Sequence, residues 1–320
     1  MQSGMEESDT MLKLPAIFSD HMILQRRKPV VIWGESDAKK VTVTIQDARV
    51  VTYVQDGKWQ LFLPPMEAGG PYVLTVKTDE EEEKVYEDVM YGEIWLAGGQ
   101  SNMELELQNS KNGAVAVTEA HNELLRFYYT PKVSYLCDEL YEQEEKSCWE
   151  LCCPENVGRW SAVGYYFARK LAAQLDVPVG IIGCNWGGTS ASCWMSREAL
   201  ENDKVISSYV EEYDAIVAEQ DFDAYCKERE EYIVYQAEFD KNCKHYYETT
   251  PNPTWEGALE VCGENKYPGP MGPRSEYRPA GLYETMIQRI APYTLAGFLY
   301  YQGAVSYTHL RAHETRSNLV

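Results

Sequence analysis

The 320-residue chain has no hydrophobic run approaching the ~20 apolar residues that a membrane-spanning helix requires. Its first ten residues lack both the basic segment and the apolar stretch of a secretory signal. We therefore expect residues 1–10 to be disordered, the protein to be cytoplasmic and a membrane not to be among its partners.

Cysteine pairs at metal-binding or redox spacing are also missing. The nine cysteines are odd in number and irregularly spaced, and Cys152 and Cys153 are adjacent where a zinc or redox motif would have Cys-x-x-Cys. This pattern fits reduced thiols better than a disulfide framework.

Basic residues are in short supply. Lysine and arginine number 29 against 50 acidic residues, which gives a net charge of −21. A strongly acidic protein is repelled by nucleic acid and by anionic membrane surfaces, so neither is expected as a partner. The same charge does not help to steer an anionic sugar toward the protein.

Residues 11–90 predict a small all-β, sandwich-like domain. Val41–Ile45 and Tyr72–Val76 alternate apolar with polar residues, as half-buried strands do, and turn residues separate them. Trp33 and Trp59 could bind sugar, although a core position is the commoner place for an aromatic ring. His21 is expected to be structural.

From residue 91 onward the pattern predicts strands alternating with helices, which implies an α/β domain with a parallel sheet covered on both faces. Ser161 is expected to cap a helix that ends at Asp176, before a strand at Val179–Gly183. Acidic residues outnumber basic ones in 203–250, which is typical of a helical insertion with a solvated face, and 251–281 is a Pro/Gly-rich loop.

Ser101 stands at a predicted strand-to-helix turn. The apolar run Ile94–Ala97 stops at two glycines, and such a turn can expose a nucleophilic serine beside backbone N–H groups. The sequence is not the Gly-x-Ser-x-Gly elbow, because Asn102 and Met103 follow the serine. By itself, such a turn is more often plain structure than a nucleophile.

Three blocks nevertheless carry a family resemblance. Gly-Gln-Ser-Asn-Met at 99–103, after Gly-Glu-Ile-Trp-Leu, resembles the nucleophile block of the sialate O-acetylesterase family of SGNH/GDSL-type carbohydrate esterases. Trp-Gly-Gly-Thr at 186–189, followed by Trp194, is similar to the second block, and Tyr-Gln-Gly at 301–303 to the third. Residues 14–25 and 31–34 resemble the opening β-domain of the same esterases.

The resemblance implies an SGNH-type, flavodoxin-like α/β/α domain over 91–303 and a serine esterase that removes O-acetyl groups from carbohydrates, either sialate 9-O-acetyl groups or those of plant glycans. No metal or organic cofactor is implied, and the partner is an acetylated carbohydrate. Glycine suits the oxyanion hole because no Cβ blocks its N–H. The implied residues are Ser101 as nucleophile, Gly188 and then Gly187 as backbone donors, Gln302 as an oxyanion or substrate contact, and Gln100, Asn102, Gly187 and Thr189 at the substrate.

The chain departs from the family after Gly303. Ala304 stands where the family has glutamate, and 304–320 resemble a translated sequencing adapter rather than any relative. The Asp-x-x-His segment that supplies the family's general base is absent, and His309 and His313 do not form the His-Glu-x-x-His pattern of a zinc site. We therefore expect a truncated and poorly active esterase; the alternative is a non-catalytic carbohydrate-binding protein.

Overall fold

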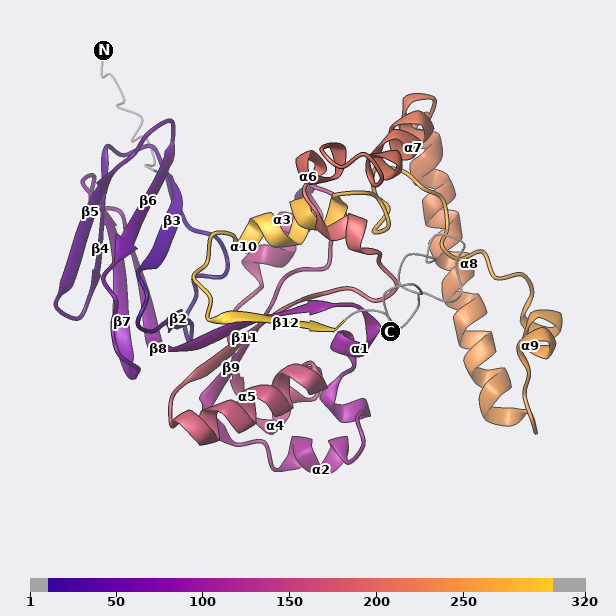
Figure 1. Cartoon of the computed structure of the whole chain (residues 1–320), viewed down its shortest axis with the longest axis horizontal. Helices are drawn as coiled ribbons and strands as arrows, with labels where there is room; N and C mark the ends of the chain where they lie inside the picture. Colours follow the sequence, from indigo (N-terminus) through magenta and orange to yellow (C-terminus); the bar gives the residue numbers. More distant parts are fainter. Residues whose placement is uncertain (1–10, 302–320) are drawn as a thin grey trace, which may run out of the picture. The chain divides into compact units, whose positions relative to one another are not determined.

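The computed structural model describes residues 11–301, which form two compact units (Figure 1). The first unit contains residues 11–132, 137–188 and 286–301, and the second contains 133–136 and 189–285. All the strands belong to the first unit.

The first eighty described residues are β-structure, as expected from their alternation. A three-stranded antiparallel sheet has the order β1 (Leu12–Lys13), β3 (Val30–Ser36), β6 (Lys58–Leu63). Three further strands pair antiparallel in the order β7 (Gly69–Thr78), β4 (Lys40–Ile45), β5 (Ala48–Tyr53). Side chains of β6 alternate between exposed and buried, which places one face of the strand in the core.

One long strand, β8 (Glu83–Gly99), joins this β-region to the rest of the unit. Its first half pairs antiparallel with β7, and its last seven residues pair parallel with β11 (Val179–Asn185). The predicted domain boundary near Met90 falls inside β8, because hydrophobic pattern alone does not show where a continuous strand changes partners.

The sheet is therefore mixed rather than parallel throughout. Parallel pairs join β9 (Asn122–Tyr129) to β11, β11 to β8, and β8 to both β12 (Gly297–Tyr301) and β2 (Ile23–Gln25). The edge strand β10 (Glu150–Cys152) is antiparallel to β9. The mixed α/β class is thus confirmed, and the predicted parallel pairing holds for one half of a nine-stranded sheet.

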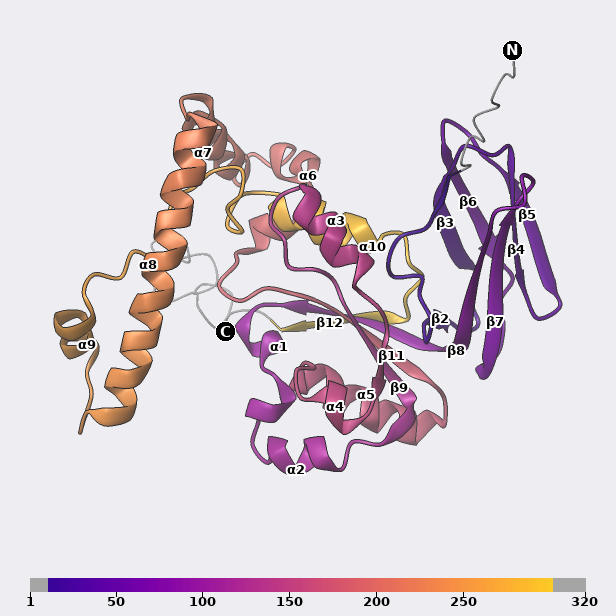
Figure 2. The same cartoon turned by 180° about the vertical axis from the view of Figure 1, so that it is seen from behind.

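Helices cover both faces of the parallel part (Figures 1 and 2). On one face lies α5 (Ala162–Leu175), which begins as predicted at Ser161, whose Oγ accepts a hydrogen bond from the Gly164 N–H at 3.1 Å. Asp176 ends this helix in the left-handed conformation. Three shorter helices are α1 (Ser101–Glu104), α2 (Gly113–Thr118) and α4 (Pro154–Val157). Helices α3 (Asp138–Glu145) and α10 (Gln288–Ile290) lie on the face of the sheet opposite α5.

The core between α5 and the sheet is rich in aromatic rings. Phe127 and Trp160 are both 1% exposed, with ring centroids 5.1 Å apart. A second tryptophan, Trp149, is equally buried but lies outside this cluster: its ring packs against Tyr128 and Tyr293, and its indole N–H donates to the Ile17 carbonyl at 2.8 Å. Residues 105–160, whose sequence pattern was difficult to interpret, thus supply two of the largest core side chains.

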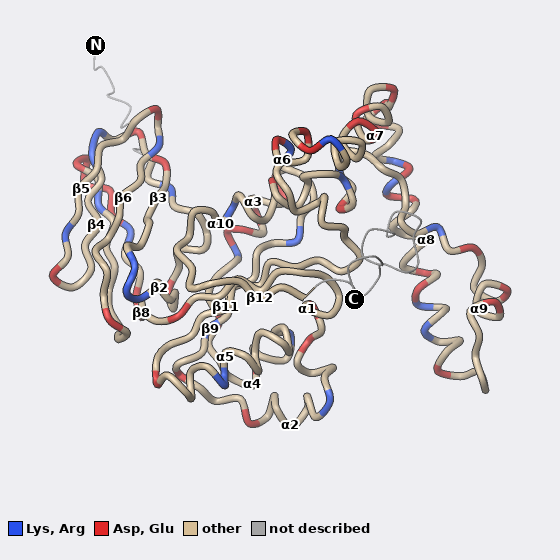
Figure 3. The backbone as a smooth tube through the Cα atoms, in the orientation of Figure 1, with Lys and Arg blue, Asp and Glu red and all other residues tan. Residues whose placement is uncertain are grey.

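The second unit is helical: α6 (Arg197–Glu201), α7 (Ser207–Ala218), α8 (Phe222–Thr249) and α9 (Trp255–Cys262). The acidic insertion is therefore helical, as expected, and Figure 3 shows acidic positions on α7 and α9. The prediction of a continuous loop over 251–281 was wrong, because Thr254 caps α9 through its Oγ1 and starts a helix between the prolines. Among residues 11–301, no helix is long and apolar enough to span a membrane.

Gly92 in β8 packs closely against Pro178, the residue just before β11. A Cβ at Gly92 would lie 2.1 Å from the carbonyl oxygen of Pro178, which itself accepts a hydrogen bond from the Glu93 N–H. We expect Gly92→Ala to lower the free energy of unfolding in urea by roughly 1–3 kcal/mol, as overpacking does. Gly98→Ala on the same strand is the control, because its nearest neighbour would be 3.5 Å away. Equal stability of the two variants would contradict the prediction.

Candidate active site

The candidate residues gather at one edge of the sheet because β8, β9, β11 and β12 run parallel. In register, Gly99 at the end of β8 lies beside Asn185 at the end of β11 and Tyr301 at the end of β12. The loops after parallel strands leave the sheet at the same edge, which is where open α/β folds place their ligands. The strand ends of all three sequence blocks thus lie side by side, although Gln302 itself falls outside the described residues.

Ser101 is presented by a sharp turn at the end of β8. Gly99 has a φ of +141°, and a Cβ there would lie 2.2 Å from the Tyr301 carbonyl oxygen, so only glycine fits. The next residue, Gln100, is 2% exposed and its N–H donates to that same carbonyl at 3.3 Å. Its own carbonyl accepts from Glu104, which closes the first turn of α1 at Ser101.

The side chains of α1 divide between core and solvent. Met103 is 1% exposed and packs in the aromatic core, whereas Ser101 is exposed and Asn102 is half-buried. Within residues 11–301, Ser101 Oγ has no hydrogen-bond partner, so it stands open to a ligand. The predicted exposure of a serine at a strand-to-helix turn is therefore found, with Met103 as its anchor.

The turn after β11 approaches Ser101 directly. The Trp186 N–H donates to the Gly99 carbonyl at 3.2 Å, and a Cβ at Gly187 would lie 3.6 Å from Ser101 Cβ. Gly188 has a φ of +81°, a backbone conformation that favours glycine. The structure thus brings the two predicted oxyanion-hole glycines to the turn that faces the serine.

A carboxylate that the sequence reasoning missed holds this turn. Glu104 Oε2 accepts a hydrogen bond from the Gly187 N–H at 2.6 Å, and its Oε1 forms an ion pair with Lys132. Hydrogen bonds to a charged acceptor are stronger than neutral ones, so this contact ties α1 to the glycine turn. The available signal was the position of Glu104, one helical turn after Ser101 and on the same side of α1.

Around Ser101 the surface forms a hollow of about 700 Å³, here called the serine cleft. Besides Ser101, its wall includes two carboxylates, Glu104 and Glu106, and three cationic residues, Lys132, Lys146 and Arg159. Tyr129 also lines it, and burial raises the pKa of this phenol well above its ordinary value, so the ring stays neutral. With three cations against two carboxylates, the cleft is close to balanced in charge although the protein as a whole is acidic.

The remaining predicted positions are more scattered. Thr189 is 1% exposed and its Oγ1 accepts from the Trp194 indole at 2.9 Å, both within the second unit. Trp59 is 3% exposed and fills the core of the β-region, whereas Trp33 is half-buried. His21 has its Nδ1 2.7 Å from Asp88 Oδ2, a hydrogen bond that supports a structural role.

The thiols near the site are poorly suited to nucleophilic attack. Burial raises the pKa of Cys184, in β11, to about 12 and that of Cys152 to about 11, so both remain protonated near neutral pH. Among residues 11–301, no cluster of three or more His, Cys, Asp or Glu is arranged to hold a metal ion. Ser101 is the exposed nucleophile that the site offers.

Residues 91–250 match the model of a family described as carbohydrate esterase, sialic acid-specific acetylesterase, and the chain belongs to that family. The family expected from the sequence blocks is thereby confirmed.

Individual relatives extend the match. The chain is 30% identical to a sialate O-acetylesterase of Pongo abelii and 29% identical to that of Homo sapiens, each over a 214-residue alignment that covers 59% of this chain and 40% of the relative. A crystal structure of a carbohydrate acetylesterase from Xanthomonas citri superposes with a TM-score of 0.62 at 26% identity, over 92% of this chain and 51% of that one. The matches thus span less than half of each sialate O-acetylesterase and about half of the crystallised enzyme.

The hydrogen bond between Glu104 and Gly187 can be tested without an enzyme assay. We expect Glu104→Ala to speed hydrogen exchange of the Gly187 amide about tenfold, since a charge-assisted hydrogen bond of about 1.5 kcal/mol is lost. Amide exchange measured by NMR checks this. Glu104→Gln, which keeps an acceptor oxygen, and Lys132→Met, which leaves the carboxylate in place, should both preserve most of the protection. Unchanged exchange in Glu104→Ala would show that the carboxylate-to-amide bond is not what holds the turn.

Proposed function

We propose that this chain is a serine esterase region that releases acetyl groups from carbohydrate hydroxyls through an acyl-enzyme on Ser101. The observation that carries the proposal is the register at the sheet edge, which sets the exposed serine against the Gly187–Gly188 turn. An SGNH-type, flavodoxin-like arrangement of the domain is part of the proposal. The four mutually parallel strands β9, β11, β8 and β12, with helices on both faces, support it.

In the first chemical step, Ser101 Oγ attacks the acetyl carbonyl carbon while its proton passes to a general base. The carbonyl oxygen becomes an oxyanion, which the backbone N–H groups of Ser101 and Gly188 stabilise. Gly187 is the second candidate, and its N–H donates to Glu104. The tetrahedral intermediate then expels the sugar alkoxide, which takes the proton, and water later releases acetate from the serine.

The general base is the part of the machinery not found among the described residues. His21 is engaged by Asp88, and no histidine within 11–301 hydrogen-bonds Ser101 Oγ. A serine hydroxyl without an adjacent base is a weak nucleophile. We therefore propose that the printed chain turns over slowly.

The substrate belongs to the acetylated carbohydrates, with sialate 9-O-acetyl groups and acetylated plant glycans as the two candidates. Lys132, Lys146 and Arg159 at the serine cleft offset locally the overall charge of −21, so an anionic sugar is not repelled there. The overall charge supports the absence of nucleic acid partners. The nine free cysteines, all within the described residues, support a cytoplasmic location.

Carbohydrate binding without catalysis is the second candidate. It is favoured by a large aromatic-lined cleft in the first unit, to which Trp33 and Tyr53 contribute. Glycan binding by a protein whose full-length form shows no Ser101-dependent hydrolysis would favour this reading.

Replacement of the nucleophile tests the esterase directly. We expect Ser101→Ala to reduce acetate release from acetylated xylan and from 4-nitrophenyl acetate to the buffer rate, because no acyl-enzyme can form. Ser208→Ala is the control, since this exposed hydroxyl on α7 donates a hydrogen bond only to the carbonyl of Val205, just before the helix. The assay uses the printed chain and any longer product of the same gene. Unchanged release by Ser101→Ala would refute the proposal.

The oxyanion donor gives a separate test. Gly188→Ala is expected to lower kcat by about 10²–10³, the usual cost of losing one oxyanion-hole donor, because a Cβ at a φ of +81° forces the backbone to shift. Gly57→Ala is a matched control: it has a φ of +75° and nothing within 4 Å, so it carries the strain without touching the site. A similar kcat for both variants would remove Gly188 from the mechanism.

A further inference from the structure

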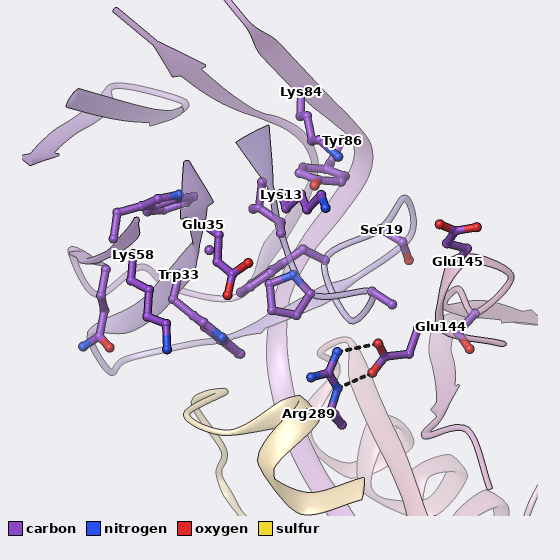
Figure 4. Close-up of a pocket in the computed structure, with 18 of the residues that line it drawn as sticks. Lys13, Ser19, Trp33, Glu35, Lys58, Lys84, Tyr86, Glu144, Glu145 and Arg289 are labelled. Carbon is purple, nitrogen blue, oxygen red and sulfur yellow. Dashed lines mark hydrogen bonds and ion pairs between the residues drawn. The ribbon is translucent and has the colours of Figure 1, made fainter. Parts of the chain in front are cut away.

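A second and larger cleft opens in the first unit, on the side of the β-region. It has a volume of about 1510 Å³ and is lined by strands β1, β3, β5, β6 and β8 together with α3 and α10; we call it the aromatic cleft. Figure 4 shows Trp33, Glu35 and Lys58 on its strand side and Arg289 and Glu144 on its helical side. A volume this large accommodates several sugar rings, whereas one acetyl ester needs far less.

Exposed aromatic rings give this cleft its character. Tyr53 is 72% exposed and Tyr141 is 47% exposed, and both line it together with Trp33 and Tyr86. Large tyrosine side chains left in water at a concave surface are typical of binding sites rather than of core or plain surface. Flat, partly apolar faces of this kind suit the faces of pyranose rings.

The charges of the aromatic cleft cancel. Its lining carries four cations and four carboxylates: Lys13, Lys58, Lys84 and Arg289 against Asp20, Glu35, Glu144 and Glu145. Arg289 is held by both oxygens of Glu144, at 2.6 and 2.5 Å. A balanced set of donors and acceptors has no net attraction for a polyanion but can bond many hydroxyls. The chemistry therefore fits a neutral, hydroxyl-rich ligand.

The aromatic cleft and the serine cleft share a wall. Helix α3 contributes Tyr141 and Glu144 to the aromatic cleft and Gln143 to the serine cleft, and Ser147, just after the helix, lines both. Both clefts lie within the first unit. The two clefts therefore meet at Ser147, where one ligand chain could contact both.

We propose that the aromatic cleft binds a neutral stretch of a glycan chain and that the same chain continues past Ser147 to present its acetylated unit to Ser101. This names the substrate of the proposed esterase as an extended polysaccharide rather than a single sugar, and for that step it rests on the proposed function. The binding step stands on the cleft alone.

Binding is tested first, in the Ser101→Ala background so that no ester is consumed. Isothermal titration calorimetry with xylohexaose, cellohexaose and mannohexaose is expected to detect at least one ligand, with oligogalacturonate as the acidic comparison. The double variant Tyr53→Ala, Tyr141→Ala should weaken binding about tenfold, because two stacking faces are lost. Phe62→Ala is the matched control, a 56% exposed ring on β6 that does not line the cleft. Absence of binding to all three neutral chains, tighter binding of oligogalacturonate, or an unchanged affinity of the double variant would each overturn the proposal.

Kinetics then separate this inference from the esterase assignment. With Ser101 intact, the ratio of kcat/KM on acetylated xylan to kcat/KM on 4-nitrophenyl acetate is expected to fall about tenfold in the double variant, mainly through KM for the polymer. An unchanged ratio would refute the continuous path along α3. Neutral glycan binding that depends on Tyr53 and Tyr141, without any Ser101-dependent hydrolysis, would instead refute the esterase and leave the binding site established.

Discussion

The structure depends on the parallel hydrogen-bonded register between β8 and its neighbours. Because Gly99 pairs with Asn185 on one side and Tyr301 on the other, three strand ends far apart in sequence lie at a common edge of the sheet. A slip of one residue would turn every side chain of β8 to the opposite face and move the Ser101 turn away from Gly187. Close packing enforces the register, since Gly92 and Gly99 each face a backbone oxygen that leaves no room for a Cβ.

The site adds one ionic contact to this frame. Glu104 stands between Lys132, after β9, and the Gly187 amide, after β11, so one carboxylate connects three of the loops at the sheet edge. Backbone donors stabilise an oxyanion only when they are already aimed at it. A short turn rich in glycine is intrinsically free to move, and a charge-assisted bond from a helix anchored by Met103 restricts that freedom without placing a side chain in the substrate's path.

Local signals in the sequence were enough for much of the fold. The alternation in β4 and the Ser161 cap of α5 predicted those elements because each depends on a few neighbouring residues. The nucleophile turn was predictable from its two glycines and its match to a known family. Contacts between distant segments could not be predicted from the sequence. The continuity of β8 and the Glu104–Lys132 ion pair depend on tertiary pairing, as does the joining of the antiparallel and parallel strands into one sheet. Helix α9 was missed because its cap at Thr254 lies among prolines that indicate a loop.

Because β8 belongs both to the β-region and to the parallel half of the sheet, the two parts cannot be separated as domains. The two halves of β8 pair with different strands. A cut between them would leave backbone groups unpaired, and it would expose the buried residues Val89 and Tyr91 on one side and Ile94 on the other. The β-region is therefore not a removable module in the manner of a domain on a linker. Shuffling or deletion during evolution would have to carry all of β8 with it, so the β-region and the parallel half of the sheet are inherited as one piece.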